Sequence, residues 1–291
     1  MSFTVYTDGC SNLPGELLER HDIRVLPCHY EMDGQPRVYD GNMEAFDFHA
    51  YYEKLRGGST FKTSLLNTHL FIDTFTPVLE QGQDVVYVGM TSGISGTIHA
   101  ATIAAQELQE SFPGRTVRVI DSLGAGFGTG MLAIRASELS REGKTASQAG
   151  DILDEEVQHT LNYFTVEDLN FLKRGGRVTG ATAAIGTVLN IKPVLQIQGE
   201  KIDAYAKVRG MHQAVEKMLD AICDDITGRF NGMNLHVGTA YSGDPEIGLK
   251  WQKYVQSRLP RCRVHSAPLS LSIACHTGPG AIGIGCFYYE K

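Results

Sequence analysis

Short apolar runs alternate with amphipathic stretches over the first half of the chain. The runs SFTVYT, DVVYVGM and TVRVIDS have the length and the β-branched content of strands that are buried in a parallel sheet. A helix-periodic segment follows each of them, and Pro77 is expected to kink or divide the helix predicted over NTHLFIDTFTPVLEQG. This alternation predicts a doubly wound parallel sheet with right-handed crossovers.

The pattern changes near residue 160. From LNYFTV onward it predicts a helix, a glycine turn and a second, apolar helix over GATAAIGTVLN. The segments IKPVLQIQ and KIDAYAKVR then read as a hairpin that turns at Gly199 and Glu200, which indicates a mixed or antiparallel sheet. We therefore predict an α/β fold with two domains, an N-terminal one over residues 1–160 and a C-terminal one over 161–291. The last strand, near AIGIGCFYY, is expected to pack back near the domain interface.

Composition narrows the class of protein. The chain is 42% hydrophobic and 20% charged, which suits a substantial core, and its net charge of -7 with interleaved signs argues against nucleic acid as a partner. No apolar run approaches the ~18 residues of a membrane span, and the start of the chain lacks the basic and apolar regions of a signal peptide. Six scattered cysteines without a C-x-x-C pair indicate buried free thiols, so we expect a cytoplasmic protein.

The stretch TSGISGT connects an apolar strand to an alanine-rich helix. Ser92, Ser95 and Thr97 fall where that helix begins, so their hydroxyls, free backbone N–H groups and the positive end of the helix dipole converge there. Such a corner suits an anion.

Two further polar clusters interrupt apolar elements, KTS at residues 62–64 and CHTGPG at 275–280. The second cluster places His276 before a glycine-proline-glycine turn, a rigid irregular segment that can hold an imidazole at a surface cleft. Any one cluster alone is best explained by helix capping or a turn. Together they leave two kinds of site open. In a hydrolase or acyltransferase, Ser92 or Ser95 would be the nucleophile and His276 its base, whereas in a binding protein the same groups would hold a carboxylate.

Two glycine-rich segments have structural explanations. GAGFGTG, residues 124–130, lacks the spacing of a dinucleotide-binding loop, and its small residues are best explained by close approach of a helix to a sheet. In FLKRGGRVTG, Gly175 is expected to form a left-handed helix cap with basic residues around it. Arg177 lies beyond that cap, so the cap does not explain its charge, which is available to bind a phosphate or an acidic partner surface.

These motifs, in this order, resemble the DegV family, the fatty-acid-binding subunits of bacterial fatty acid kinase. The resemblance rests on YTDGCSNLP at the start, KTS, TSGISGTIHAA, IDS at 120, LKRGGRVTGA, LNIKPVLQIQGEKIDAYAKVRG and HTGPGAIGIG, and so covers the whole chain. It implies a non-catalytic lipid-binding carrier without a cofactor, in which a long-chain fatty acid lies in an apolar tunnel between two α/β domains. It also implies an ATP-dependent kinase partner that phosphorylates the carboxylate to an acyl phosphate for phospholipid metabolism, and it leaves transient membrane contact open.

The resemblance also assigns residues. Carried onto this chain, the carboxylate ligands are Thr63, Ser95 and His276, with Ser64, Ser92 and Gly96 nearby, and the residues that face the kinase are Arg177 and Arg209. The chain departs from the family pattern in two places. Gly9 and Cys10 stand where the family usually has serine, and TSLLN lacks the usual Gln and Pro.

Overall fold

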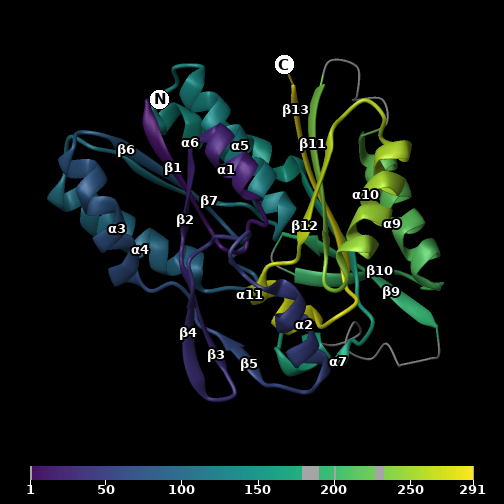
Figure 1. Ribbon diagram of the computed structural model, residues 1–291. Coiled ribbons are helices and arrows are strands. Elements are labelled where there is room, and N and C mark those ends of the chain that lie inside the picture. The colour runs from purple at the N-terminus through teal and green to yellow at the C-terminus, as the bar shows by residue number, and fades with distance from the viewer. Residues whose placement is uncertain (1, 179–189, 200, 227–232, 291) are drawn as a thin grey trace.

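The computed structural model describes residues 2–178, 190–199, 201–226 and 233–290 and contains two large sheets in an α/β arrangement (Figure 1). The first sheet is fully parallel, with the strand order β2-β1-β6-β7. Its strands are β1 (Phe3–Asp8), β2 (Ile23–Leu26), β6 (Asp84–Gly89) and β7 (Val117–Asp121). The predicted parallel sheet in the first half of the chain is therefore confirmed.

Helices cover both faces of the parallel sheet, as they must when both faces are apolar. One face packs against α3 (Thr68–Glu80) and α4 (Thr97–Ser111). The other face packs against α1 (Gly15–His21), α5 (Phe127–Arg141) and α6 (Ala146–Glu156), which η1 (Val157–His159) follows. Alternate residues of each strand divide between the two cores. Val86 and Val88 face α5, whereas Val85 and Tyr87 face α3 and α4.

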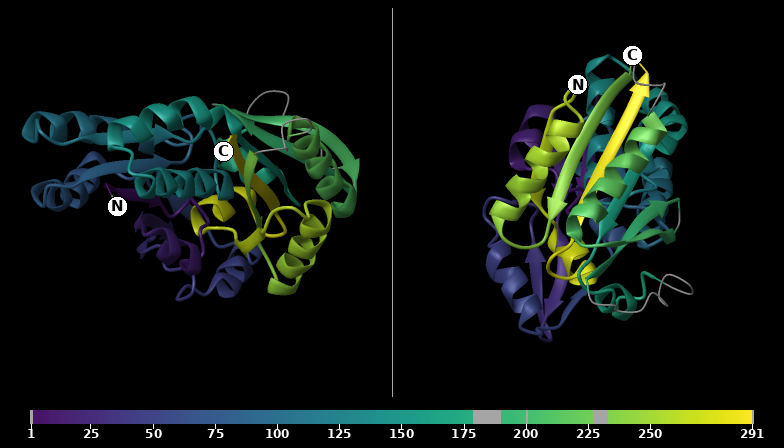
Figure 2. Two further views of the ribbon diagram at one scale, coloured as in Figure 1. Left: turned by 90° about the horizontal axis from the view of Figure 1, so that it is seen from above. Right: turned by 90° about the vertical axis from the view of Figure 1, so that its right-hand side faces the viewer.

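The second large sheet is mixed, with the order β10-β9-β8-β13-β11-β12. Its strands are β8 (Thr160–Thr165), β9 (Ile191–Gln198), β10 (Lys201–Arg209), β11 (Met233–Tyr241), β12 (Val264–Pro268) and β13 (Ile282–Glu290). Helices α9 (Met211–Ile226) and α10 (Pro245–Arg258) cover its outer face (Figures 1 and 2). The predicted hairpin of β9 and β10 and the mixed sheet are thus confirmed.

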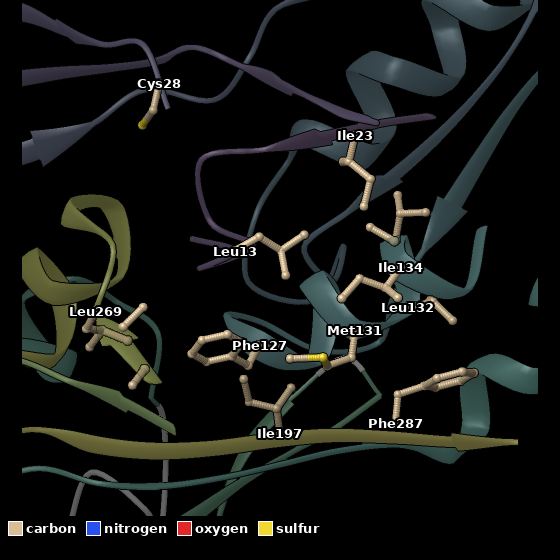
Figure 3. Packing of buried hydrophobic residues seen from close by; sticks show 14 of the residues in the cluster. Leu13, Ile23, Cys28, Phe127, Met131, Leu132, Ile134, Ile197, Leu269 and Phe287 are labelled. Carbon is tan, nitrogen blue, oxygen red and sulfur yellow. The ribbon is translucent and has the colours of Figure 1, made fainter. Parts of the chain in front are cut away.

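Helix α5 lies between the two large sheets. It contacts β1 and β6 on one side and β8, β11 and β13 on the other, and residues 127–137 are all buried. Figure 3 shows Met131 and Phe127 between Leu13 on one side and Ile197 on the other. Small residues permit this close packing. A Cβ on Gly130 would lie 2.4 Å from the backbone oxygen of Ser11. Residues 124–130 thus serve helix packing, as expected.

A small antiparallel sheet stands apart from the other two, in the order β4-β3-β5 (Figure 1). It consists of β3 (Cys28–Met32), β4 (Gln35–Tyr39) and β5 (Phe61–Thr63), and α2 (Phe48–Arg56) connects its last two strands. Two short helices complete the described chain, α7 (Asn170–Arg174) and α11 (Leu271–Thr277). These smaller elements surround one end of the gap between the large sheets and carry several candidate site residues.

Several local predictions were wrong. The segment LNYFTV is the strand β8, not a helix, because its aromatic and β-branched residues pair with β9 and β13. Pro77 does not divide α3, because it lies in the last turn of the helix and the buried Phe71, Phe75 and Val78 hold the helix against the sheet. Residues 180–189 of the helix predicted over GATAAIGTVLN lie outside the described residues.

Candidate functional site

A cavity of about 680 Å³ opens beside the carboxyl ends of β1 and β6 and runs between the two large sheets. This is the edge at which α/β sheets place their ligands. Its apolar wall includes Leu66, Ile94, Phe127, Ile197, Leu269 and Ile273. Hydroxyl groups and one imidazole gather in another part of the wall, so the cavity suits an amphipathic molecule better than a fully polar one.

Thr63 and His276 meet at this cavity although 213 residues separate them in the sequence. Thr63 ends β5, His276 belongs to the last turn of α11, and Oγ1 of Thr63 lies 3.1 Å from Nε2 of His276. His276 is therefore helical, and the glycine-proline-glycine segment begins two residues after it, as expected. The chain does leave α11 at Gly278, whose φ of +77° suits glycine. Two residues expected to share a ligand are thus in hydrogen-bonding contact.

The imidazole of His276 is neutral near physiological pH. Burial, and to a lesser extent the positive charge of Arg177, lower the pKa of His276 to about 4. Gly175 provides the space for the ring, because a Cβ at this position would lie 2.3 Å from Nδ1 of His276. Gly175 itself has right-handed backbone angles and Gly176 has the positive φ of +70°, so the left-handed cap predicted at Gly175 was placed one residue too early.

The TSGISGT corner is the start of α4, as the sequence predicts. Gly96 is the N-cap of α4, Oγ of Ser95 donates to Oγ1 of Thr97 over 3.0 Å, and the N–H of Thr97 donates to Oγ of Ser95. The N–H of Ser92 donates to Asp121 at the end of β7. Ser64 continues the chain after Thr63 and also lines the cavity. The six predicted carboxylate ligands, Thr63, Ser64, Ser92, Ser95, Gly96 and His276, therefore all lie on the wall of one cavity.

The two arginines expected at the kinase surface occupy different places. Arg177 is half-buried, lines the cavity near His276 and donates a hydrogen bond to the carbonyl of Gly175. Arg209 is exposed at the end of β10 and is not part of the cavity wall. Lys173 and Arg174 are exposed on α7, just before Arg177. Arg177 thus lies between the cavity and the exposed basic residues Lys173 and Arg174.

The sequence did not identify several residues of the cavity wall. Cys10 and Cys28 are among them, and Sγ of Cys10 lies 3.0 Å from Oγ of Ser272. Burial raises the pKa of Cys28 to about 12 and that of Cys10 well above its usual value, so both thiols stay protonated at neutral pH. Asn162 of β8 is another wall residue without a sequence signal. Only the fold shows that these residues lie on the cavity wall.

The described contacts do not include the pair that a serine hydrolase needs. Nε2 of His276 contacts the hydroxyl of Thr63, and in the described ranges no hydrogen bond joins His276 to Ser92 or Ser95.

Outside residues 179–189, 200 and 227–232, no group of three His, Cys, Asp or Glu side chains is arranged to hold a metal ion. In the same part of the chain, no helix combines the length and apolar character that a membrane crossing needs. The hydroxyl groups and the imidazole of the cavity wall are accompanied by four charged side chains, those of Asp8, Arg177, Lys201 and Asp203.

The low pKa of His276 makes the stability of the fold depend on pH. Below about pH 6.5 the unfolded chain binds a proton that the folded imidazole does not bind until about pH 4, so the free energy of unfolding should fall across this interval. We expect His276→Gln, which cannot titrate, to lose about 2 kcal/mol less than the wild type between pH 7 and pH 4.5. Urea unfolding at the two pH values measures this difference, and equal losses in both proteins would contradict the prediction.

The chain is similar to proteins of one family over nearly its full length. A family model described as "Uncharacterised protein, DegV family" matches residues 2–289. The DegV domain-containing protein YteA of Lactococcus lactis is 30% identical over 285 residues, which cover 98% of this chain and 97% of the relative. The DegV domain-containing protein lin2658 of Listeria innocua is 32% identical over 282 residues, or 96% of each chain.

Solved structures with the same fold include proteins described as fatty acid binders. A DegV family protein from Thermus thermophilus, described by its fatty acid binding, gives a TM-score of 0.86 at 33% identity and covers 99% of this chain and 100% of its own. A stearic acid-binding protein from Eubacterium ventriosum gives 0.85 at 26% identity, with 98% of each chain covered. DegV of Bacillus subtilis, also described as a fatty acid binding protein, gives 0.84 at 25% identity, with 99% and 100% covered.

Proposed function

Since the chain belongs to the DegV family, we propose that it binds a long-chain fatty acid in the cavity between its two large sheets and presents the carboxylate to a separate kinase. The observation that carries this proposal is the contact between Thr63 and His276 on the wall of an otherwise largely apolar cavity. The solved relatives that are described as fatty acid binders support the class of ligand. The protein would be a carrier, with catalysis in an ATP-dependent kinase subunit.

The affinity would come mainly from the acyl chain. Each buried CH₂ contributes roughly 0.8 kcal/mol, so a tail of about sixteen carbons supplies ~12 kcal/mol before the costs of ordering. The head group needs only to be oriented and kept paired, because an unpaired buried carboxylate would become protonated. Thr63, Ser95 and neutral His276 would supply hydrogen bonds, and Arg177 the nearby positive charge.

The cellular setting is part of the proposal. We place the protein in the cytoplasm, where six free thiols persist, and we expect transient contact with a membrane surface when the ligand is exchanged. The division into domains at residue 160 also remains a proposal. Its closest structural counterpart is the start of β8, the first strand of the mixed sheet, at Thr160.

The direct test is to denature the purified protein, extract it with organic solvent and identify the extract by mass spectrometry. We expect about one fatty acid per chain, because the cavity has the volume that holds one small ligand. Protein that yields no fatty acid, takes up none and reacts with a serine-directed probe would instead favour the hydrolase hypothesis.

Substitutions of the two arginines should distinguish an effect on fatty acid binding from an effect on kinase docking. Arg209→Ala is expected to slow acyl phosphate formation by the kinase roughly tenfold without changing fatty acid affinity, because Arg209 is exposed and lies off the cavity wall. Arg177→Ala should lower both the affinity and the rate, because Arg177 lines the cavity. Fluorescence titration and a coupled kinase assay measure the two effects, with Lys250→Ala on the outer helix α10 as the charge-loss control. Unchanged rates in both arginine variants would exclude a docking role for them.

A further inference from the structure

Thr91 is a polar residue that lies completely inside the protein, at the start of the TSGISGT corner. Its hydroxyl makes two hydrogen bonds. Oγ1 donates to the backbone oxygen of Gly199 over 2.9 Å and accepts from the N–H of Gly93 over 3.3 Å. A hydroxyl has a single proton and two lone pairs, so one group can fill both roles at once. Thr91 therefore connects two segments that are far apart in the chain.

The first bond reaches the mixed sheet. Gly199 follows the last residue of β9, and its φ of +61° suits the turn that leads into β10. Ile197 of β9 and Ile202 of β10, on either side of this turn, are buried and line the cavity. The Thr91 hydroxyl thus joins the β9–β10 hairpin, which contributes to the cavity wall, to the corner that follows β6 of the parallel sheet.

The second bond shapes the corner itself. The N–H of Ile94 donates to the backbone oxygen of Thr91 over 3.3 Å, so residues 91–94 form a turn, and the bond from Gly93 to Oγ1 adds a side-chain contact to it. The N–H of Thr91 donates to the backbone oxygen of Gly124 over 2.9 Å. The turn that carries Ser92 and leads to Ser95 is therefore held from several sides by one residue.

Thr91 acts on the cavity only through its neighbours. Met90 and Ser92, the residues before and after it, line the cavity, as do Gly93 and Ser95. Thr91 itself is not part of the wall and has no exposed surface. Its side chain cannot reach a ligand, so any influence on binding comes from the placement of the corner.

We propose that Thr91 is a positioning residue for the head-group site, whose hydroxyl fixes the corner against the β9–β10 hairpin so that Ser92 and Ser95 face the carboxylate. This inference rests on the proposed fatty acid binding and adds a residue that sets the preference for a charged head group. Without the hydroxyl, the N–H of Gly93 and the backbone oxygen of Gly199 lose this partner. The apolar wall around Phe127 and Leu269 belongs to other elements and would keep its contacts with the acyl chain.

The test compares palmitic acid with hexadecanol, which has a chain of equal length but a neutral head group. Delipidated full-length protein is titrated with each ligand by displacement of a fluorescent fatty acid. Hydrogen bonds to a charged group are the stronger ones, so the acid depends more on the geometry of the corner. In Thr91→Val the affinity for palmitic acid should fall about five- to tenfold, whereas that for hexadecanol should stay within about twofold of the wild type. Thr91→Ser, which keeps the hydroxyl, should keep the wild-type preference for the acid.

Thr7→Val provides the matched control. Thr7 of β1 also has no exposed surface, its hydroxyl donates to the backbone oxygen of Val88 over the same 2.9 Å, and it does not line the cavity. Urea unfolding should show that both valine variants lose stability, because each loses a buried hydrogen bond. Only Thr91→Val should change the ratio of the two affinities. Thr91→Ala takes the place of Thr91→Val if valine prevents folding.

Three results would overturn the inference. They are equal losses for the acid and the alcohol in Thr91→Val, unchanged affinity for both ligands in that variant, and a Thr91→Ser variant that behaves like Thr91→Val. A loss of preference in Thr7→Val as large as in Thr91→Val would overturn it too, since the effect would then follow from lost stability. Wild-type protein that binds neither ligand would instead contradict the proposed function.

Discussion

Replacing His276 with alanine is expected to weaken fatty acid binding by roughly 10- to 100-fold, the range for losing a hydrogen bond to a charged group. The physical reason is that the imidazole is neutral and half-buried beside Thr63, where it can act only by donating or accepting a hydrogen bond. Its loss would leave the ligand carboxylate and the Thr63 hydroxyl short of a partner. Titration of delipidated protein with stearic acid measures the change, and Thr63→Val should weaken binding in the same direction.

His265 is the matched control for this experiment. It lies on β12, and burial lowers its pKa to about 4, as it does for His276. His265 does not line the cavity, however, so His265→Ala should leave fatty acid affinity within about twofold of the wild type, as for a change away from a binding site. Equal losses in the two variants would show that the effect comes from general destabilisation and not from the head-group site.

Replacing Gly285 with alanine is expected to lower the free energy of unfolding by about 3 kcal/mol, near the upper end for overpacking. A Cβ on Gly285 would lie 2.4 Å from the backbone nitrogen of Gly128, at the start of α5. Backbone atoms of a buried helix cannot rotate away as the end of a flexible side chain can. The helix would therefore have to move off the sheet and disturb the packing of Phe127. Urea unfolding measures the loss.

Gly283 on the same strand separates this clash from the general effect of alanine in a strand. The atom nearest to a Cβ there is Cβ of Phe164 at 3.6 Å, which is an ordinary contact distance. Gly283→Ala should therefore change the free energy of unfolding by less than about 0.5 kcal/mol. If both variants lose the same stability, the close approach of α5 to β13 is not the cause.

Strand-helix alternation was enough to predict the parallel sheet, because its strands are short apolar runs with clear helices between them. The same reasoning failed at β8, because the helix α7 follows it after only a few residues and their patterns merged into one predicted helix. The pairing of β8 with β9 and β13 involves partners up to the end of the chain. Local pattern does not carry such long-range information.

The polar residues of the candidate site belong to sequence motifs and could be predicted. The apolar residues of its wall belong to no motif and could not. Thr63, Ser95 and His276 stand in distinctive polar clusters that are visible in the amino-acid sequence itself. The apolar wall is not visible there, because Phe127 and Ile197 look in sequence like ordinary core residues and both also belong to the main core. Asn162 had no signal either, because nothing in its strand sequence distinguishes it and only the fold brings it to the cavity wall.

The position of α5 has a consequence for how the two halves of the molecule depend on each other. Helix α5 belongs to the first half of the chain, yet its buried residues are covered partly by β8, β11 and β13 of the second half. A fragment ending at residue 160 would expose that side of the helix and be prone to self-association. The two halves are separate in sheet topology, but we expect them to unfold together in one cooperative transition.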